Sequence, residues 1–335
     1  MNSFEESSGI YFIYDGECPM CTKAALALRI KKAYGDLTLI NARENLDHPI
    51  VLQITELKLD LDEGMVLYDG DHFYHGKEAL KLMARYGDRK GLFNLFNKSF
   101  FRFDLIARLL YPSMRSVRNW LLARKKVGQI DNLGLKQVPI FQSIFGDSWN
   151  ELPLVMKKHY ANHPYSNDLT QVNGKLDVMC AGPIKWFAAL FWLMKGIPPI
   201  NERNVDVSVD FESDPNSKSF YFNRCFSFAA RKPYRFRSRM IQIKDNEVIE
   251  IMASRLGWRM NIVWEDKRVK LKHKGYAFCL FGYFIPLPLT MLLGVGNAEE
   301  VAIDDNTFDM FVDISHPLWG KIYEYKGRFK TQVET

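Results

Sequence analysis

Two cysteines, Cys18 and Cys21, have the spacing of a thiol-disulfide exchange pair. Cys18 follows a short apolar run and precedes Pro19, so we expect it to cap a helix that begins at the proline. Unpaired N–H groups and the positive end of the helix dipole favour a thiolate there, and the thiolate is the nucleophile in disulfide exchange. Cys21 lies one turn later on the same helix face and can attack a mixed disulfide at Cys18. The pattern predicts Cys18 as the attacking thiol and Cys21 as the resolving thiol.

The elements around this pair follow the order β-α-β-α-β-β-α. A tight turn, Asp69-Gly70-Asp71, joins the third and fourth expected strands into a hairpin. The expected strands are residues 10–14, 37–41, 65–69 and 72–74, and the expected helices are 19–34, 49–57 and 77–86. This is the element order of a thioredoxin-like domain.

Two other interpretations of the cysteine pair remain open. The cysteines could do no chemistry, or they could hold structural zinc together with His72 and His75. In a thioredoxin-like domain the start of the third strand, near Gly64 and Met65, approaches the cysteines, whereas His72 lies at the far end of the hairpin. We therefore expect no metal at the pair, and no cofactor elsewhere.

The N-terminal half resembles the DCC family, thioredoxin-like proteins named for an Asp-Cys-Cys pattern. The resemblance covers residues 9–126 and implies a thiol-disulfide oxidoreductase with Asp15, Cys18 and Cys21 as functional residues. Asp15 would accept or relay a proton during exchange, or cap the turn that it starts. The matching segments are Tyr14-Asp15-Gly16-Glu17-Cys18-Pro19-Met20-Cys21, Leu67-Tyr68-Asp69-Gly70 and His75-Gly76-Lys77-Glu78-Ala79-Leu80.

The resemblance does not identify the redox partner, which could be a protein thiol or disulfide or a small thiol. Thioredoxin has a cis-proline that docks the substrate backbone, and this chain has no proline before Met65. The departure weighs against the binding of extended polypeptides.

Basic residues concentrate in one stretch of the chain. The whole chain has 45 Lys and Arg against 39 Asp and Glu, a net charge of +6, and it has no recognisable nucleic-acid-binding module, so we expect no nucleic-acid partner. Residues 85–126 alone carry 11 basic and 2 acidic side chains. Two helices, 100–110 and 114–126, are expected to break at Pro112 and to pack an apolar stripe on the first domain, with Arg and Lys in water. A peripheral membrane contact through residues 93–126 is the alternative.

The second half has the pattern of an antiparallel β-rich domain. Apolar and polar residues alternate strictly from Val205, and similar alternation recurs up to Phe329 between tight turns. Helices at 148–160 and 183–195 could cover an open face of a curved sheet or barrel. The uncharged segment 275–298 contains Pro286 and Pro288, which favours a strand and turn over a membrane helix.

The chain is therefore expected to have two domains of different fold class. The first is an α/β thioredoxin-like domain with a helical tail, and the second is an antiparallel, barrel-like α+β domain. The expected boundaries are residues 1–127, a linker at 128–143, and residues 144–335.

The second domain resembles a bacterial domain-of-unknown-function family found after DCC domains and after saccharopine-dehydrogenase-like domains. The segments that carry this resemblance are Phe145-Gly146-Asp147-Ser148-Trp149, Phe284-Ile285-Pro286-Leu287-Pro288-Leu289, His316-Pro317-Leu318-Trp319-Gly320 and Tyr325-Lys326-Gly327-Arg328-Phe329.

Arg224 is the candidate binding residue of the second domain. It lies in the middle of an aromatic row on one strand face, between Phe222 and Phe226. If that face is interior, the guanidinium needs an anionic partner, because an unpaired buried charge is costly. The partner could be an internal Asp or Glu, or the carboxylate or phosphate head of an amphipathic ligand. We therefore expect a domain that binds an apolar or anionic amphipathic ligand.

The predicted protein is a cytoplasmic thiol-disulfide oxidoreductase fused to a ligand-binding β domain. The acidic start of the sequence does not have the pattern of a secretory signal, and five cysteines in 335 residues are too sparse for a disulfide scaffold. The alternatives are a non-enzymatic lipid or small-molecule binder, or a peripheral membrane protein, with an inactive redox domain. The pKa of Cys18 distinguishes them, because an active pair needs a thiol more acidic than usual.

Overall fold

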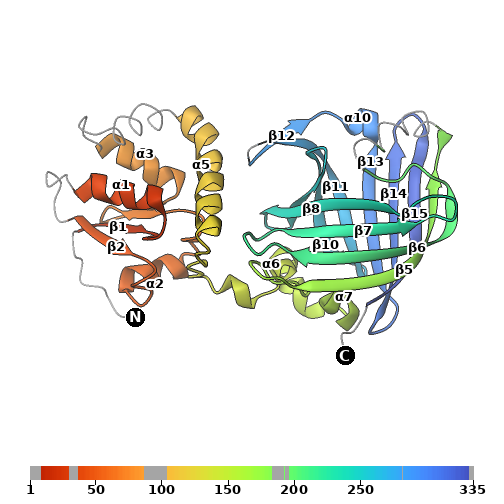
Figure 1. Cartoon of the computed structure of the whole chain (residues 1–335), viewed down its shortest axis with the longest axis horizontal. Coiled ribbons are helices and arrows are strands. Elements are labelled where there is room, and N and C mark those ends of the chain that lie inside the picture. Colours follow the sequence, from red (N-terminus) through yellow and green to blue (C-terminus); the bar gives the residue numbers. More distant parts are fainter. Residues whose placement is uncertain are drawn as a thin grey trace. The chain divides into compact units, whose positions relative to one another are not determined.

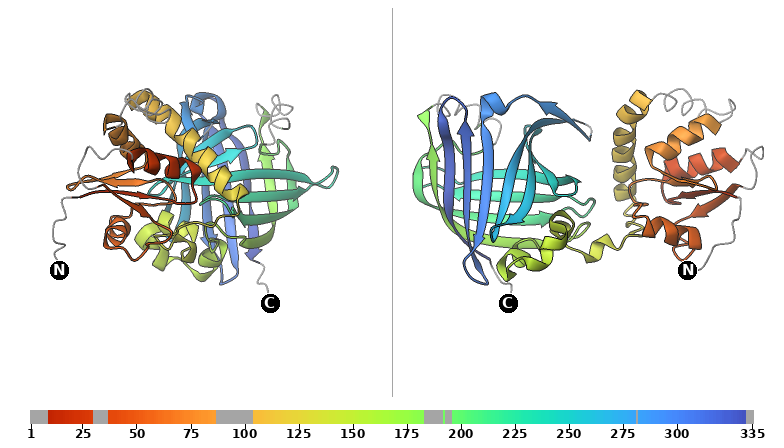
Figure 2. Two further views of the ribbon diagram at one scale, coloured as in Figure 1. Left: turned by 60° about the vertical axis from the view of Figure 1, so that its left-hand side comes forward. Right: turned by 180° about the vertical axis from the view of Figure 1, so that it is seen from behind.

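The computed structural model describes residues 9–29, 37–86, 104–182, 192, 196–280 and 282–331. The chain divides into two compact units, Met1–Leu135 and Lys136–Thr335 (Figures 1 and 2). The boundary falls inside the stretch expected to be a linker, 128–143, because residues 128–135 belong to the first unit.

The first unit is a small α/β domain built on a mixed four-stranded sheet. The strand order is β2-β1-β3-β4, with β1 parallel to β2 and antiparallel to β3. The element order matches the sequence prediction, which confirms the α/β, thioredoxin-like fold class. The elements are β1 (Ile10–Tyr14), α1 (Pro19–Arg29), β2 (Leu37–Asn41), α2 (Pro49–Glu56), β3 (Val66–Tyr68), β4 (Phe73–His75) and α3 (Lys77–Tyr86).

Helices cover both faces of this sheet. Phe12 of β1 and Leu67 of β3 point to the face on which α1 and α3 pack, whereas Ile13 and Val66 point to the face of α2. This alternation follows from the two-residue period of a strand. Cys18 is therefore placed between the end of a buried strand and the start of a buried helix, as the sequence predicted.

One helix, α5 (Asp104–Arg124), passes through Pro112 without ending there. The predicted break is therefore wrong. A proline removes one main-chain hydrogen bond, but packing on both sides of it holds the helix here: Tyr111 and Met114 pack in the core, and the Tyr111 hydroxyl donates to the carbonyl of Glu63 at 2.8 Å. Arg118 is also buried, against the expectation that the basic residues of this helix lie in water.

The outer face of α5 keeps the membrane-contact hypothesis open as a prediction. Val117 and Trp120 are exposed on it, and the Arg124 guanidinium lies 5.5 Å from the centre of the Trp120 ring. Residues 93–103 of the predicted contact segment lie outside the described residues.

The segment that follows α5 packs on the first unit. Ile130 is buried in the core under α2, and the Asp62 carboxylate accepts hydrogen bonds from the backbone N–H groups of Ile130 and Asp131, both at 2.8 Å. The Asn132 side chain accepts from the Leu61 N–H at 3.0 Å. These contacts are made by the loop before β3, so residues 128–132 are part of this unit.

The second unit is a closed antiparallel β-barrel. Its sheet has eleven strands in the order β10-β9-β8-β7-β6-β5-β15-β14-β13-β11-β12, and β10 also pairs with β11. Because β12 pairs only with β11, the other ten strands close the barrel. This confirms the predicted β-rich, barrel-like class. The strands are β5 (Leu169–Cys180), β6 (Glu202–Ser213), β7 (Phe220–Ser227), β8 (Tyr234–Lys244), β9 (Glu247–Met252), β10 (Leu256–Glu265), β11 (Arg268–Leu280), β12 (Tyr283–Leu287), β13 (Val295–Ala302), β14 (Thr307–His316) and β15 (Gly320–Thr331).

Helices close one end of the barrel. Side chains of α6 (Ile140–Phe145) and α7 (Leu154–His159) join the barrel core, and a 3-10 segment, Gly146–Glu151, connects them. The helix predicted at 148–160 is therefore shorter, because Pro153 forces the residue before it into an extended conformation and α7 begins only after the proline. The helix predicted at 183–195 lies outside the described residues, apart from Trp192.

The described part of the uncharged segment 275–298 forms strands and turns, as expected, together with one short helix. It contains the end of β11, all of β12, a short helix α10 (Thr290–Leu293) and the start of β13. Among the described helices, none combines the length and the hydrophobicity that a membrane-spanning segment needs.

A glycine permits the close contact between β5 and β15, and it provides a stability test. A Cβ on Gly327 would clash with the backbone carbonyl of Lys175 and with Leu176. We expect Gly327→Ala to destabilise the barrel by about 1–3 kcal/mol, because the neighbouring atom is backbone and cannot move aside. Gly182→Ala, whose Cβ meets no atom of the described residues within 4 Å, is the matched control. Calorimetry should show a lower melting temperature for the first variant alone, and equal effects would contradict the packing assignment.

Candidate functional site

The cysteine pair lies at the junction between the end of β1 and the start of α1. Cys18 immediately precedes the first residue of α1, and the backbone N–H of Cys21 donates to the Cys18 sulfur at 3.2 Å. Both side chains are buried, at 0% and 3% exposure, and all five cysteines of the chain are reduced. The pair is thus a buried dithiol in which one sulfur accepts a hydrogen bond from the first turn of the helix.

The two thiols of the pair have opposite acidities. The hydrogen bond from the Cys21 thiol lowers the pKa of Cys18 to about 6; burial opposes this, and the Cys21 N–H and the charge of Arg118 add to it. The pKa of Cys21 is raised far above its ordinary value, because its proton is held by Cys18 and its side chain is buried. Cys18 therefore carries the thiolate at neutral pH and Cys21 keeps its proton, which is the division of roles that exchange requires.

Asp15 is held by two arginines at the end of β1. Its carboxylate oxygens lie 2.6 Å from Arg43 Nε and 2.9 Å from an Arg118 guanidinium nitrogen. Burial raises the pKa of Asp15, but the hydrogen bond and charge of Arg43 and the charge of Arg118 outweigh it, so the pKa lies below its usual value. Asp15 also accepts a hydrogen bond from the Glu17 N–H at 3.0 Å. A carboxylate with these partners is an anchor for cations and a turn cap.

Arg118 connects α5 to the cysteine pair. Its side chain is 5% exposed and donates to Asp15 and to the carbonyl oxygen of Asp62. Burial lowers its pKa, but the charges of Cys21, Cys18 and Asp15 more than compensate, so the pKa is raised and the guanidinium stays charged. Its Nε has no hydrogen-bond partner among the described residues. The site therefore contains a buried cation with an unused donor beside a thiolate.

The start of β3 completes the site, as the sequence predicted. Gly64 and Met65 line a small cavity of about 30 Å³ together with Cys21 and residues of α5. Tyr111 is another lining residue, and burial raises its pKa to about 12, so it stays protonated. A Cβ on Gly64 or Gly76 would clash with the Tyr111 hydroxyl, so these glycines make room for α5.

Comparison with known families agrees with this division of the chain. Residues 152–329, more than half of the chain, match the family described as "Domain of unknown function (DUF4166)". The chain belongs to the DUF4166 family. Residues 12–124 match the family described as "DCC1-like thiol-disulfide oxidoreductase". The two resemblances seen in the sequence are thereby confirmed. The second unit of the chain, the barrel, is a DUF4166 domain.

Other comparisons add little. No curated protein matches the chain. One solved structure, the "Dehydratase domain of the polyketide PpsC from Mycobacterium tuberculosis", is 6% identical, and the alignment covers 56% of this chain and 84% of that chain with a TM-score of 0.13. So low a score supports no conclusion about fold or function.

Arg224 points into the DUF4166 barrel and is paired there. Its guanidinium lies 2.9 Å from the Glu250 carboxylate and 3.0 Å from the Ser238 hydroxyl, which itself donates to Glu250. The rings of Phe222 and Phe236 lie 4.5 and 5.0 Å from its guanidinium carbon. The interior aromatic face is as expected, and an internal glutamate occupies the anionic position, as in the first of the two alternatives drawn from the sequence.

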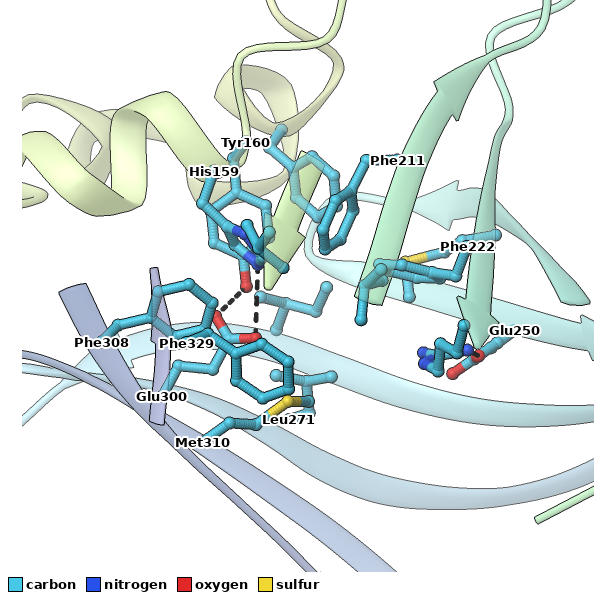
Figure 3. A pocket seen from close by; sticks show the side chains of 16 residues that line it. His159, Tyr160, Phe211, Phe222, Glu250, Leu271, Glu300, Phe308, Met310 and Phe329 are labelled. Atoms are coloured by element: carbon cyan, nitrogen blue, oxygen red, sulfur yellow. Dashed lines mark hydrogen bonds and ion pairs between the residues drawn. The ribbon is translucent and has the colours of Figure 1, made fainter. Parts of the chain in front are cut away.

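A second polar cluster lies in the same barrel interior. The Tyr160 hydroxyl donates to Glu300 at 2.5 Å, and His159 Nε2 lies 3.5 Å from the other oxygen of that carboxylate (Figure 3). The three side chains are buried, and His159 Nδ1 has no hydrogen-bond partner among the described residues. Both clusters line one cavity of about 40 Å³, together with apolar side chains such as Phe211 and Phe308.

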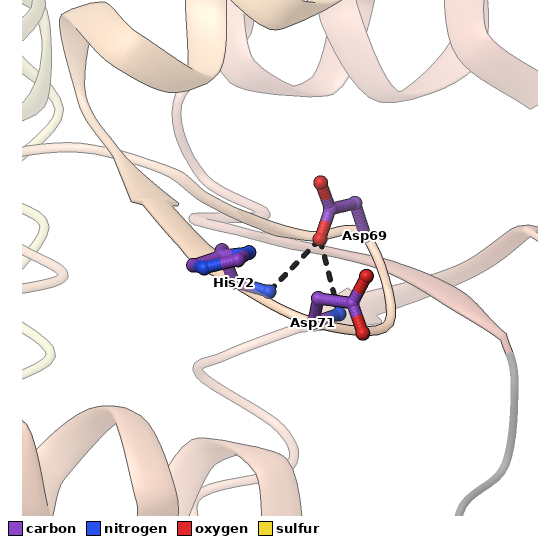
Figure 4. A group of neighbouring side chains, drawn as sticks. All are labelled: Asp69, Asp71 and His72. Carbon is purple, nitrogen blue, oxygen red and sulfur yellow. Dashed lines mark hydrogen bonds between the residues drawn. The ribbon is translucent and has the colours of Figure 1, made fainter.

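The hairpin turn of the DCC1-like unit carries a group of potential metal ligands. Asp69, Asp71 and His72 lie together at the tip of β3 and β4 (Figure 4). One Asp69 oxygen already accepts from the backbone N–H groups of Asp71 and His72, at 3.1 and 2.9 Å, which is the bonding of an ordinary turn. The group contains no cysteine, and His75 Nε2 donates to the carbonyl of Asp60 at 2.9 Å. His72 and His75 are thus not gathered with Cys18 and Cys21.

The structure adds residues that the sequence did not single out. Arg43 and Arg118 bind Asp15, and Glu250 and Glu300 supply the charges of the barrel interior. Arg118 lies in a basic helical stretch, and nothing in the sequence distinguished it from the other Arg and Lys residues there as a partner for Asp15. The burial of Glu300 follows the alternation of β13, a strand that the sequence analysis did not predict.

The charge of Arg118 gives a test by pH. The fraction of Cys18 thiolate rises with pH, so alkylation of the reduced protein should be half-maximal near pH 6. Arg118→Met should move this midpoint up by roughly one unit, because an attracting charge is lost. Arg115→Met is the matched control, since Arg115 lies one turn away in α5 and is half exposed.

The same shift predicts a stability change in the reduced protein. Folded Cys18 loses its proton near pH 6, whereas an unfolded cysteine does so near pH 9, so between these values the unfolded chain binds more protons and stability rises with pH. In the alkylation experiment, a half-maximal pH for Arg118→Met equal to that of the native protein would contradict the assigned role of Arg118.

Proposed function

We propose that the DCC1-like unit is a thiol-disulfide oxidoreductase in which Cys18 attacks and Cys21 resolves. The observation that carries the proposal is the pairing of the two sulfurs at the start of α1, with a lowered pKa at Cys18 and a raised pKa at Cys21. The match of residues 12–124 to a thiol-disulfide oxidoreductase family supports it. An inactive redox domain would not need this difference in acidity.

The reaction that these residues support transfers two electrons to a disulfide. The Cys18 thiolate attacks one sulfur of the partner disulfide, forming a mixed disulfide and releasing the first partner thiolate. Cys21 then loses its proton to a released thiolate and attacks the Cys18 sulfur, which frees the second partner thiolate and leaves a Cys18–Cys21 disulfide. The partner gains two electrons and the pair loses two. The reverse sequence oxidises a partner dithiol.

Asp15 acts in this proposal by positioning Arg118. Its carboxylate is ion-paired and has a lowered pKa, so it is a poor proton acceptor, but it fixes the guanidinium that stabilises the Cys18 thiolate. Stabilising the thiolate favours the reduced pair, which makes the disulfide a better oxidant.

The burial of the pair favours a small redox partner. Cys18 is fully buried, and the cavity beside Cys21 has a volume of only about 30 Å³ under α5. A partner must displace some of the side chains that bury Cys18, and a small disulfide or thiol needs the smaller displacement. The reducing cytoplasm is the compartment proposed for this chemistry, since the three other cysteines are also free thiols.

The experiment is a redox titration of the full chain in glutathione buffers, read by alkylation and mass spectrometry. A reversible two-electron couple between Cys18 and Cys21 is the expected result. Metal content is measured on the same sample. Failure to form this disulfide at any potential, or stoichiometric zinc on the reduced cysteines, would sink the proposal.

The DUF4166 barrel supports a second proposed function, the binding of an amphipathic ligand. The interior cavity is mostly apolar, and His159 Nδ1 is a buried polar atom without a partner among the described residues. Because Glu250 already neutralises Arg224, a neutral hydroxyl or carbonyl head fits better than an anionic one. A cavity of about 40 Å³ is much smaller than an alkyl chain, so a ligand of this kind must displace lining side chains when it binds. Calorimetric titration with decanol and with decanoate tests this: tighter binding of decanol, lost in His159→Phe, is expected, and heat from neither compound would contradict it.

A further inference from the structure

The up-and-down order of the barrel strands sorts their connections between two rims. Each strand is antiparallel to the next along the chain, so alternate connections lie at the same end. The "α10 rim" consists of the described residues of the connections 181–201, 228–233, 253–255, 281–294 and 317–319. The "α7 rim" consists of the connections 214–219, 245–246, 266–267 and 303–306, together with helices α6 and α7. Figures 1 and 2 show α10 and β12 at the opposite end of the barrel from α6 and α7.

Large apolar side chains are exposed on the α10 rim. Leu318, Met291 and Leu292 are 76%, 68% and 61% exposed, the highest values among the large apolar residues of the described chain. Ile285 and Trp319 are also exposed there. The Trp319 ring stacks on His316 with 4.2 Å between ring centres, so it is held at the surface. These side chains come from two separate connections, 281–294 and 317–319, and together form an apolar edge that no described residue of the barrel unit covers.

The charges of the two rims differ in sign. The described connections of the α10 rim carry three basic residues, Arg231, Lys232 and Arg255, all exposed, and no acidic residue. The four strand connections of the α7 rim carry five acidic residues and two basic ones. A carboxylate beside the basic turn 228–233, that of Glu202 at the start of β6, accepts the Ala229 N–H at 2.8 Å. The barrel is thus polarised, with its apolar edge on the positive end.

We propose that the α10 rim docks the barrel on the surface of an anionic lipid bilayer. Leu318, Met291 and Leu292 enter the boundary between head groups and acyl chains, and Trp319 lies at the head-group level, where an amphipathic ring is favoured. The basic turns contact anionic head groups at the same time. Protruding apolar side chains from two connections, on a rim whose described connections carry only basic charges, fit a soft anionic surface better than a folded partner with its own shape.

The test is flotation of the full-length protein with vesicles. The protein should bind phosphatidylcholine vesicles that contain about one-third phosphatidylglycerol, and bind pure phosphatidylcholine much more weakly. Leu318→Asp and Met291→Asp should each lower binding by at least about tenfold, because an inserted apolar side chain is replaced by a charge. Lys232→Glu and Arg255→Glu should each lower it by about fivefold or more, and added salt should remove the difference.

Matched variants on the opposite rim are the controls. Ile303→Asp replaces an exposed apolar residue of the α7 rim, and Lys267→Glu reverses an exposed charge there. Both should bind vesicles as the native protein does, and all variants should keep the native circular dichroism and melting temperature. Trp120→Ser removes the exposed ring of α5 and should also bind normally.

Several results would overturn the proposal. They are equal binding to neutral vesicles, equal losses for variants of both rims, or loss of binding only in Trp120→Ser, which would move the contact to the helical tail. A change in sedimentation rather than in flotation for Leu318→Asp and Met291→Asp would instead make the rim an interface between copies of the chain.

Discussion

Cys18→Ser is expected to abolish reduction of oxidised glutathione by the dithiol protein, with a loss of about a thousandfold or more. Cys18 is the sulfur with the lowered pKa and the helix N–H contact, and no other described sulfur shares these features. Cys21→Ser should instead stop after the first step and accumulate one glutathione on Cys18, because the resolving thiol is gone. Mass spectrometry of the alkylated protein separates the two outcomes.

A cysteine of the barrel provides the control for this experiment. Cys225→Ser removes a half-buried thiol far along the chain and should leave the exchange rate unchanged. Glutathione found on Cys21 in the Cys18→Ser variant, at a rate near that of the native protein, would reverse the assigned roles.

Breaking the Arg224–Glu250 pair is expected to destabilise the barrel strongly. Among the described residues, Arg224→Met leaves the buried Glu250 carboxylate with only the Ser238 hydroxyl as a side-chain hydrogen-bond partner, and a buried charge without its partner costs about 3–5 kcal/mol. Hydrogen exchange of peptides from β7 and β9, read by mass spectrometry, measures the loss locally, which suits a chain of two units. Exchange in β1 and β3 should be unchanged.

Two further variants make the result interpretable. Arg224→Met/Glu250→Leu removes both charges and should recover most of the stability, since apolar replacements of a buried pair are often neutral. Arg237→Met breaks an exposed pair between β8 and Glu212 of β6 and should cost no more than about 1 kcal/mol. If the double variant were as unstable as Arg224→Met, volume rather than charge would explain the loss.

The sequence by itself determined the local features of both units. The position of Cys18 before Pro19 depends only on neighbouring residues, and it predicted the start of α1 correctly. The alternation from Val205 placed β6 and its inward face for the same reason, because a strand has a two-residue period. Both family resemblances rested on short segments of this kind.

Only the tertiary structure decided which distant residues meet. Arg118 reaches Asp15 across more than a hundred residues because α5 continues through Pro112, where the local rule predicted a break. Glu250 and Glu300 come together in one interior because the sheet closes through β10 and β11, a pairing whose register no local pattern reveals. The sorting of apolar and basic turns onto one rim also depends on closure. The spacing of neighbouring residues determines local features such as the position of Cys18 before α1. The partners of buried charges depend instead on packing between segments that are remote in sequence.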